Sequence, residues 1–257
     1  MSAIRGDTVQ SNGRATVQTT EHEELIRLCE CKDRFIAVAG HELRNVLAPI
    51  VTSLDCLVEY SENETQAELL RIAAKHAKQL GHLIDDLFDA SRLASGKLQL
   101  RHETIDMRSI ADRSIQSVTP ATIERRQQLL LTRCDSPLWL HADPLRLEQV
   151  FLNLLSNATK YTPKGGCIWV QLSRENDRAI FQVRDSGSGI KPELIPYMFD
   201  FFSQADGDKG HAASGGLGIG LAMVKSLVEL HGGTVDAQSD GPDRGAEFTV
   251  RLPLHWK

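Results

Sequence analysis

Residues 153–162 read Asn-Leu-Leu-Ser-Asn-Ala-Thr-Lys-Tyr-Thr and end a segment in which apolar side chains recur at every third or fourth position. This spacing predicts a helix over residues 145–160 with one buried face, formed by Leu147, Phe151, Leu154 and Ala158. Asn153, Asn157 and Lys160 then share a neighbouring polar stripe. Because amide oxygens suit a hard cation and an ammonium group suits phosphate, the stripe favours a magnesium-nucleotide site. A solvated helix face is the alternative interpretation.

Two glycine-rich stretches follow, each beside a predicted regular element. Asp185-Ser186-Gly187-Ser188-Gly189-Ile190 follows a strand candidate; its glycines permit close backbone approach, and Asp185 could accept from an exocyclic amine such as that of adenine. Gly215-Gly216-Leu217-Gly218-Ile219-Gly220 leads into a helix starting at Leu221, whose free N–H groups suit phosphate oxygens. Neither stretch matches the P-loop or the dinucleotide fingerprint, and ordinary turns are the alternative for each. Residues 191–214 have the composition of a lid over a site.

The first part of the chain has the pattern of two amphipathic helices. Apolar positions step by three or four from Ile36 to Leu57 and again from Ala73 to Leu87, with a break at 61–64 between them. Such a hairpin has one apolar stripe on each helix and cannot make a dry core alone. A dimeric four-helix bundle is therefore expected.

His41 and Asn45 fall opposite the apolar stripe of the first helix and lie one turn apart. The neighbouring Glu42 carboxylate would favour a protonated imidazole or fix the tautomer of the ring. An ordinary surface histidine is the alternative, because exposed histidines are common.

The remaining sequence sets the domain boundaries. After Gly96 helical segments alternate with strand candidates at 167–172, 179–184 and 248–252, which predicts an α/β sandwich of helices on one sheet. Residues 1–20 are polar and lack apolar periodicity, as expected of a disordered leader. The sequence thus predicts a leader over 1–20, a helical hairpin over 21–98 and an α/β domain over 103–257.

Composition excludes several classes of protein. A net charge of -5 over 257 residues argues against a nucleic-acid partner, and no run of about 18 apolar residues predicts a membrane span. The five cysteines lack paired spacing, so reduced thiols are expected rather than a zinc site or disulfides. We expect a cytoplasmic chain.

The order of the motifs carries more information than any one of them. Five segments in this order resemble the sensor histidine kinase family, in which a phosphoacceptor hairpin precedes the ATP-binding domain shared with gyrase, Hsp90 and MutL: 35–47, 153–162, 185–190, 199–202 and 216–221. The resemblance covers roughly residues 25–254. It implies a homodimer that uses ATP and Mg²⁺ to phosphorylate its own histidine and then passes the phosphoryl group to the receiver domain of a response regulator.

The resemblance also implies a role for each residue of the site. His41 would accept the phosphoryl group, Glu42 would polarise its ring, and Asn45 would orient water in members with phosphatase activity. Asn157 would ligate Mg²⁺. The nucleotide-binding residues would be Asn153, Lys160, Tyr161, Asp185, Gly187, Gly189, Gly216, Gly218, Gly220 and Leu221, with Phe199 and Phe202 anchoring the lid.

Two other functions compete with this interpretation. One is an ATPase of the gyrase, Hsp90 or MutL type, which resembles the family in its nucleotide domain but has a Glu four residues before the metal-binding Asn. Here that position is Asn153, which cannot act as a general base. The other is a nucleotide-binding scaffold without transfer activity. The chain departs from the family at two positions: Val46 stands where the family usually has Pro, and Ala246 stands where many members carry Thr.

Overall fold

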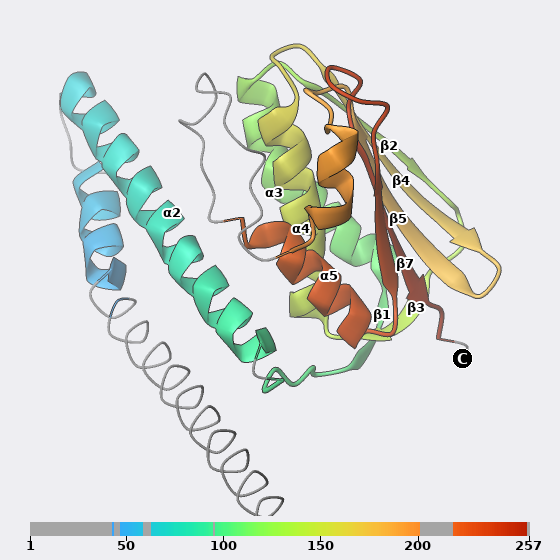
Figure 1. Ribbon diagram of the computed structural model, residues 1–257. Helices are drawn as coiled ribbons and strands as arrows, with labels where there is room; N and C mark the ends of the chain where they lie inside the picture. The colour runs from blue at the N-terminus through green and yellow to red at the C-terminus, as the bar shows by residue number, and fades with distance from the viewer. Residues whose placement is uncertain (1–42, 44–46, 59–62, 95, 201–217, 256–257) are drawn as a thin grey trace, which may run out of the picture. The chain divides into compact units, whose positions relative to one another are not determined.

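The computed structural model describes residues 43, 47–58, 63–94, 96–200 and 218–255 (Figure 1). By its internal contacts the chain divides into two compact units, Met1–Lys97 and Leu98–Lys257. Several predictions concern residues outside the described part of the chain. These are the leader, residues 201–214 of the lid, and the site residues His41, Glu42, Asn45, Phe202 and Gly216. No helix among the described residues is both long enough and apolar enough to cross a membrane.

The first unit is a helical hairpin. A helical segment over residues 47–58 precedes α2 (Glu64–Ala94), whose first turn is capped by Asn63 Oδ1, the acceptor of the Thr65 N–H at 3.0 Å. Lys78 Nζ lies 2.9 Å from Asp55 Oδ2, and a side chain at Gly81 would contact Leu47. Asp55 thus faces Lys78, whereas Leu47, earlier in the chain, faces Gly81, which is later. The two helices are therefore antiparallel, as predicted.

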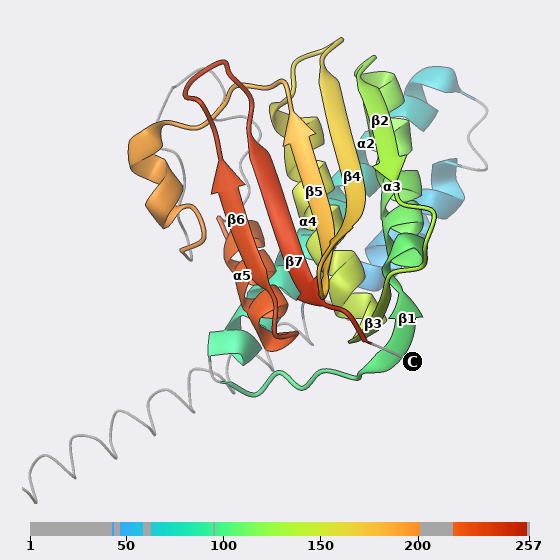
Figure 2. The same ribbon diagram turned by 90° about the vertical axis from the view of Figure 1, so that its right-hand side faces the viewer.

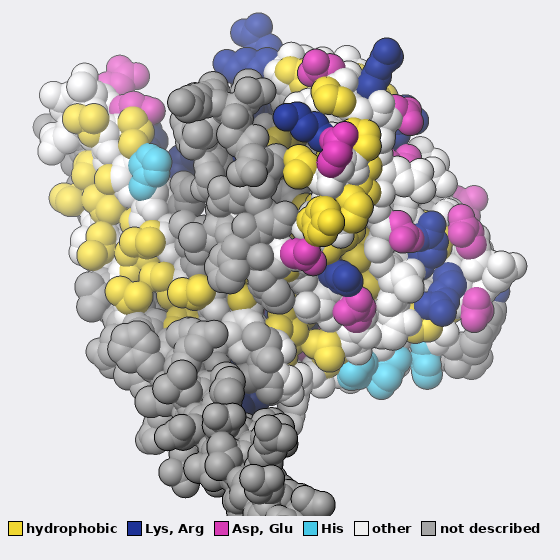
Figure 3. All heavy atoms as spheres, viewed as in Figure 1, with side chains coloured by type: hydrophobic (Ala, Val, Ile, Leu, Met, Phe, Trp, Pro, Cys, Tyr) yellow, Lys and Arg dark blue, Asp and Glu magenta, His cyan; other side chains and the backbone are white. Residues whose placement is uncertain are grey.

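Apolar side chains on the hairpin form a buried stripe and an exposed one. The buried stripe of α2 is rich in alanine: Ala67, Ala74, Ala77 and Ile84. The exposed residues include Leu43, Ile50 and Leu57 at intervals of seven, together with Leu69, Ile72, Leu80 and Leu87. The predicted α2 stripe is thus divided, with Leu80 still 48% exposed. Yellow side chains accordingly gather over the hairpin in Figure 3.

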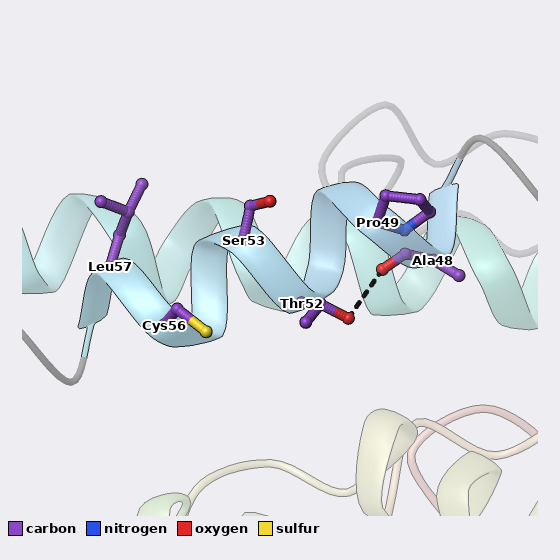
Figure 4. A pocket seen from close by; sticks show the side chains of 6 residues that line it. All are labelled: Ala48, Pro49, Thr52, Ser53, Cys56 and Leu57. Atoms are coloured by element: carbon purple, nitrogen blue, oxygen red, sulfur yellow. Dashed lines mark hydrogen bonds between the residues drawn. The ribbon is translucent and has the colours of Figure 1, made fainter.

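A shallow hollow lies on the face of the first helix of the hairpin. It is lined by Ala48, Pro49, Thr52, Ser53, Cys56 and Leu57, all from one helix (Figure 4). The Thr52 hydroxyl donates to the carbonyl of Ala48 at 3.0 Å and so turns its polar atom back onto the backbone. The hollow therefore presents mostly apolar surface.

The second unit is built on a five-stranded sheet in the order β2–β4–β5–β7–β6 (Figure 2). Its strands are β2 (Gln128–Arg133), β4 (Cys167–Glu175), β5 (Arg178–Asp185), β6 (Thr234–Gln238) and β7 (Glu247–Pro253). β2 pairs with β4 in parallel, and the other neighbours are antiparallel. A separate antiparallel pair joins β1 (Glu103–Asp106) to β3 (Trp139–Ala142).

Three helices cover one face of the sheet, as Figures 1 and 2 show. They are α3 (Met107–Glu124), α4 (Pro144–Tyr161) and α5 (Gly220–Leu230); a short 3₁₀ helix, η1, spans Pro192–Tyr197. The rings of Phe151 on α4 and Phe181 on β5 stack with centroids 3.8 Å apart, both fully buried. A continuous apolar core between helices and sheet results, and the predicted α/β sandwich is confirmed.

Candidate nucleotide-binding site

The middle of α4 lies against the start of α5. Leu154 and Ala158 are buried, which leaves Asn153 and Asn157 on the flank of the helix. The side-chain amide of Asn153 donates to the carbonyl of Gly220 at 3.5 Å, although the two residues are 67 positions apart. Among the described residues none hydrogen-bonds to the side chain of Asn157. Its amide oxygen is therefore available to a ligand from outside the chain.

The carboxyl end of α4 is contacted by Arg125, the residue that follows α3. Arg125 Nη1 donates to the carbonyl oxygens of Thr159 and Lys160, at 2.5 and 3.1 Å. The contacts use carbonyl oxygens and leave the side chains of Lys160 and Tyr161 free of Arg125. Lys160 Nζ lies 4.8 Å from the centroid of the Tyr161 ring, and Tyr161 is 52% exposed. The pair offers a positive charge and an aromatic surface at one edge of the site.

Asp185, the last residue of β5, is only 5% exposed. Its Oδ1 accepts from the N–H of Gly187 at 2.7 Å, and its own N–H donates to the carbonyl of Ala246 at 2.9 Å. Burial raises the pKa of the carboxyl group, although the backbone N–H groups of Gly187 and Ala246, which donate to the carboxyl, act in the opposite direction. A carboxylate has about four acceptor positions, more than the backbone amides of Gly187 and Ala246 can fill. The group therefore favours a ligand that brings a further hydrogen-bond donor.

Backbone crowding fixes the loop that follows Asp185. A Cβ at Gly187 would lie 2.5 Å from the carbonyl oxygen of Tyr161, and the Ser188 N–H donates to the same oxygen at 3.3 Å. Gly189 has φ +65°, and a Cβ there would collide with the carbonyl of Gly241. Both glycines are therefore required by close approach of other backbone segments.

The start of α5 differs from the starts of α3 and α4. Asp106 caps α3 and Asp143 caps α4, each accepting backbone N–H groups of the first turn, whereas Ile219 gives α5 no side-chain cap. Gly218 before it has φ +69°. The first amides of α5 therefore lack a side-chain acceptor and, with the dipole of the helix, suit an anion.

α4 joins the two ends of the site. Its middle contacts α5 through Asn153 and Gly220, and its carboxyl end contacts the Asp185 loop through the backbone of Tyr161 and Ser188. The described members of the predicted set therefore lie on α4 or on the two segments that contact it: Asn153, Asn157, Lys160, Tyr161, Asp185, Gly187, Gly189, Gly218, Gly220 and Leu221.

Some residues that shape the site were not predicted. The carbonyls of Tyr161 and Ala246 and the side chains of Arg125 and Ser239 all position predicted residues. Backbone carbonyls leave no trace in a sequence, and a lone Arg or Ser has no distinctive spacing. Their roles emerge only when β5, β6 and α4 are brought together.

Comparison with known protein families covers both units. Residues 31–96 match the His Kinase A (phospho-acceptor) domain, and residues 142–255 match the family described as histidine kinase-, DNA gyrase B-, and HSP90-like ATPase. The first match contains the predicted phosphoacceptor, and the second contains the nucleotide motifs from Asn153 to Leu221.

Individual relatives agree with these matches. The chain is 32% identical to the circadian input-output histidine kinase CikA of Synechococcus elongatus, over 97% of this chain and 34% of the relative. It is 34% identical to hybrid signal transduction histidine kinase D of Dictyostelium discoideum, over 91% of this chain and 15% of the relative. It therefore spans only a minor part of these relatives.

Among solved structures, full-length ShkA in complex with AMPPNP matches 86% of this chain and 46% of its own, with a TM-score of 0.70 and 24% identity. This likeness confirms the fold. With a phosphoacceptor domain followed by an ATPase domain, and with histidine kinases matching over nearly its whole length, the chain belongs to the sensor histidine kinase family.

Proposed function

We propose that this chain is the catalytic core of a two-component histidine kinase, which transfers the γ-phosphoryl group of ATP to His41 and then to an Asp of a response regulator. The contact of Asn153 with Gly220 carries the proposal, because it brings the polar stripe of α4 to the uncapped start of α5. Phosphate oxygens at that junction would meet free amides on one side and Asn side chains on the other.

The base of the nucleotide would lie at the carboxyl end of α4. Asp185 Oδ1 accepts from the Gly187 N–H, and the carboxylate keeps the capacity to accept from a further donor. The exocyclic amine of adenine would supply that donor, and the Tyr161 ring offers a surface beside it. A guanine or hypoxanthine base presents a carbonyl oxygen at the same place, which the carboxylate would repel. Adenine nucleotides should therefore be preferred.

The described residues also fit a magnesium ion brought by the nucleotide. No group of three His, Cys, Asp or Glu side chains in the described part of the chain could hold a metal alone. Mg²⁺ usually takes one or two protein ligands and completes its shell with phosphate and water, and the unpaired amide of Asn157 can supply one oxygen. When bound, the ion would neutralise charge on the phosphates.

The transfer itself follows from the chemistry of imidazole. A neutral ring nitrogen of His41 attacks the γ-phosphorus, the bond from that phosphorus to the β,γ-bridging oxygen breaks, and ADP leaves with the electron pair. Glu42, next to His41, would accept a hydrogen bond from the ring N–H and so orient the other ring nitrogen toward phosphorus. Asn45 would orient a water molecule that attacks the phosphorus of the regulator's phospho-aspartate, which releases inorganic phosphate and restores the Asp.

The hairpin supports a homodimer. Leu43, Ile50 and Leu57 form a heptad-spaced stripe on the first helix, each about half exposed in one protomer. With the exposed leucines of α2 they form more apolar surface than a single hairpin can cover. A second hairpin would bury this stripe in a four-helix bundle and leave the opposite face, with His41, open to the ATPase domain and to the regulator.

Labelling with γ-³²P ATP tests the proposal. We expect the parent to acquire label that is lost in acid and kept in base, as for a phosphohistidine. His41→Gln should abolish labelling and retain ATP binding, while His76→Gln, an exposed histidine on α2, should label like the parent. Labelling of His41→Gln would contradict the assignment. Phosphate release with no labelled protein would instead favour the ATPase alternative.

A further inference from the structure

The loop from Asp185 to Ile190 is held mostly by backbone atoms. The N–H groups of Ser186 and Ser188 donate to Cys167 and Tyr161, and the carbonyls of Gly187 and Ser188 accept from the N–H groups of Gly245 and Asp243. No substitution of a side chain removes these bonds. The last residue of the loop is different, because the Ile190 N–H donates to a side chain, the hydroxyl oxygen of Ser239, at 3.0 Å.

Ser239 follows β6 and uses the full capacity of its hydroxyl. Oγ accepts from Ile190 and, at 3.3 Å, from the N–H of Gly241; it donates to the carbonyl of Gly245 at 2.6 Å. A hydroxyl has one donor and two acceptor positions, so all three are filled. One side chain thus joins the end of the Asp185 loop to both sides of the β6–β7 turn.

These bonds bear on the position of Asp185. Gly245, whose carbonyl Ser239 holds, packs so closely that a Cβ there would collide with the carbonyl of Asp185. The Gly245 N–H also donates to the Gly187 carbonyl at 3.1 Å, and Gly187 in turn donates to Asp185 Oδ1 at 2.7 Å. Displacement of Gly245 would therefore move both the backbone and the carboxylate of Asp185.

We propose that Ser239 is a positioning residue for recognition of the adenine base: its hydroxyl sets the place of the Asp185 carboxylate and so the preference for a 6-amino over a 6-oxo purine. The inference rests on the proposed function, since it concerns the base end of the same site. Ser239 makes no contact with α4 or α5 among its described hydrogen bonds, so the phosphate end of the site should be unaffected by its loss.

The test compares the affinities of ATP and inosine triphosphate, measured by calorimetry. Inosine triphosphate carries the same phosphates but has an oxygen where adenine has its amine. We expect Ser239→Ala to lower the parent's preference for ATP roughly tenfold, the effect of one lost buried hydrogen bond, and to change the affinity for inosine triphosphate little. Ser239→Thr, which keeps the hydroxyl, should restore the parent's preference.

Ser114→Ala is the matched control, because it removes a buried serine hydroxyl in α3 that donates only to the carbonyl of Ile110. It should leave the preference unchanged. If Ser239→Ala left the preference unchanged, whether or not it weakened the binding of both nucleotides, the proposal would be overturned and the proposed kinase function would stand. Should Ser239→Ala fail to fold, Ser239→Cys, with its weaker donor and acceptor, must give an intermediate preference or the proposal fails. A parent that shows no preference would overturn both the role of Asp185 and that of Ser239.

Discussion

The two ends of the nucleotide site are built in opposite ways. At the base end the Asp185 loop is held by backbone hydrogen bonds and by glycines that no side chain could replace. At the phosphate end α5 begins without a side-chain cap, although α3 and α4 are both capped by aspartates. The domain therefore provides a side-chain acceptor for first-turn amides of α3 and α4 but none for those of α5.

This difference follows from what each end would bind. Discrimination between bases needs a carboxylate whose position is fixed, since a misplaced acceptor distinguishes poorly. Phosphate is bound by charge and by several equivalent oxygens, so free amides at a helix start suffice. A rigid end and an open end thus suit the two halves of one ligand.

The most severe test of the rigid end is Gly245→Ala. Gly245 has φ +71°, and a Cβ there would collide with the carbonyl of Asp185. Left-handed strain and overpacking together should lower the free energy of unfolding by about 2–5 kcal/mol, and ATP binding should be lost at temperatures where the variant is folded. Urea unfolding and nucleotide titration measure the two effects.

Gly165→Ala is the control for that experiment. Gly165 has φ +80° and open space around its Cβ position, so the variant carries the backbone strain without the collision. It should cost about 1–2 kcal/mol and leave ATP affinity unchanged. If both alanine variants bind ATP equally well, close packing at Gly245 does not position the base end.

Asp185→Asn separates recognition from stability. The amide would place a donor opposite the amine of adenine, so affinity for both ATP and adenosine should fall about a hundredfold. The stability of the nucleotide-free domain should rise instead. Burial raises the pKa of Asp185 above 3.8, so its contribution to stability is present below pH 3.8 and is lost as pH rises through the raised pKa. At neutral pH the nucleotide-free Asn variant should be more stable than the parent.

The control, Asp143→Asn, should change the stability of the domain in the opposite direction. Burial alone would raise the pKa of Asp143, but the amides of Arg101, Arg146 and Leu145 together lower it. The ionised form therefore stabilises the fold above pH 3.8, and the variant should be less stable at neutral pH. Unfolding curves between pH 4.5 and pH 8 measure the change in the free energy of unfolding for both variants. If the parent and the Asp185→Asn variant were equally stable across this range, burial of the carboxylate would carry no cost.

Much of the fold could be predicted because the packing of the central elements is periodic. The alternation of Phe248, Val250 and Leu252 identified β7, and the stripe from Leu147 to Ala158 identified α4. β2 was missed because Leu129, Leu130 and Leu131 are consecutive and the strand lies at the edge of the sheet, where alternation is weak. α3 was missed because Pro120 and a run of Ser and Thr interrupt its pattern.

The site could be predicted only as a set of side chains. Asp185 and Asn153 stand out by residue type and by their neighbours in the sequence. In the structure Asn153 lies in the middle of α4, and the loop of Asp185 contacts the carboxyl end of the same helix. The contacts that fix them involve the carbonyls of Tyr161 and Ala246 and the hydroxyl of Ser239. These depend on how strands distant in sequence turn back on one another, which local patterns do not encode.

The smallest expected effect concerns the open end. In Asn153→Asp the side chain keeps its size but gains a negative charge beside Gly220 and the uncapped amides of α5. A carboxylate there is attracted by the helix start, so the nucleotide-free domain should be as stable as the parent or slightly more so. The same charge repels phosphate and competes for its amides. ATP affinity should therefore fall about tenfold, while affinity for adenosine, which has no phosphate, should not change.

The comparison with Ser156→Asp makes this result specific. Ser156 is an exposed residue of the same helix whose described hydrogen bond is to the Asn153 carbonyl and not to Gly220, so the variant adds the same charge without placing it in the Asn153–Gly220 contact. It should weaken ATP binding much less, and that weakening should vanish at high salt because exposed charges are screened. Adenosine binding that fell in parallel with ATP binding in Asn153→Asp would mean that the two ends of the site are not independent. In that case α4 would transmit the disturbance from Asn153 to Tyr161, and the rigid end would depend on the open one.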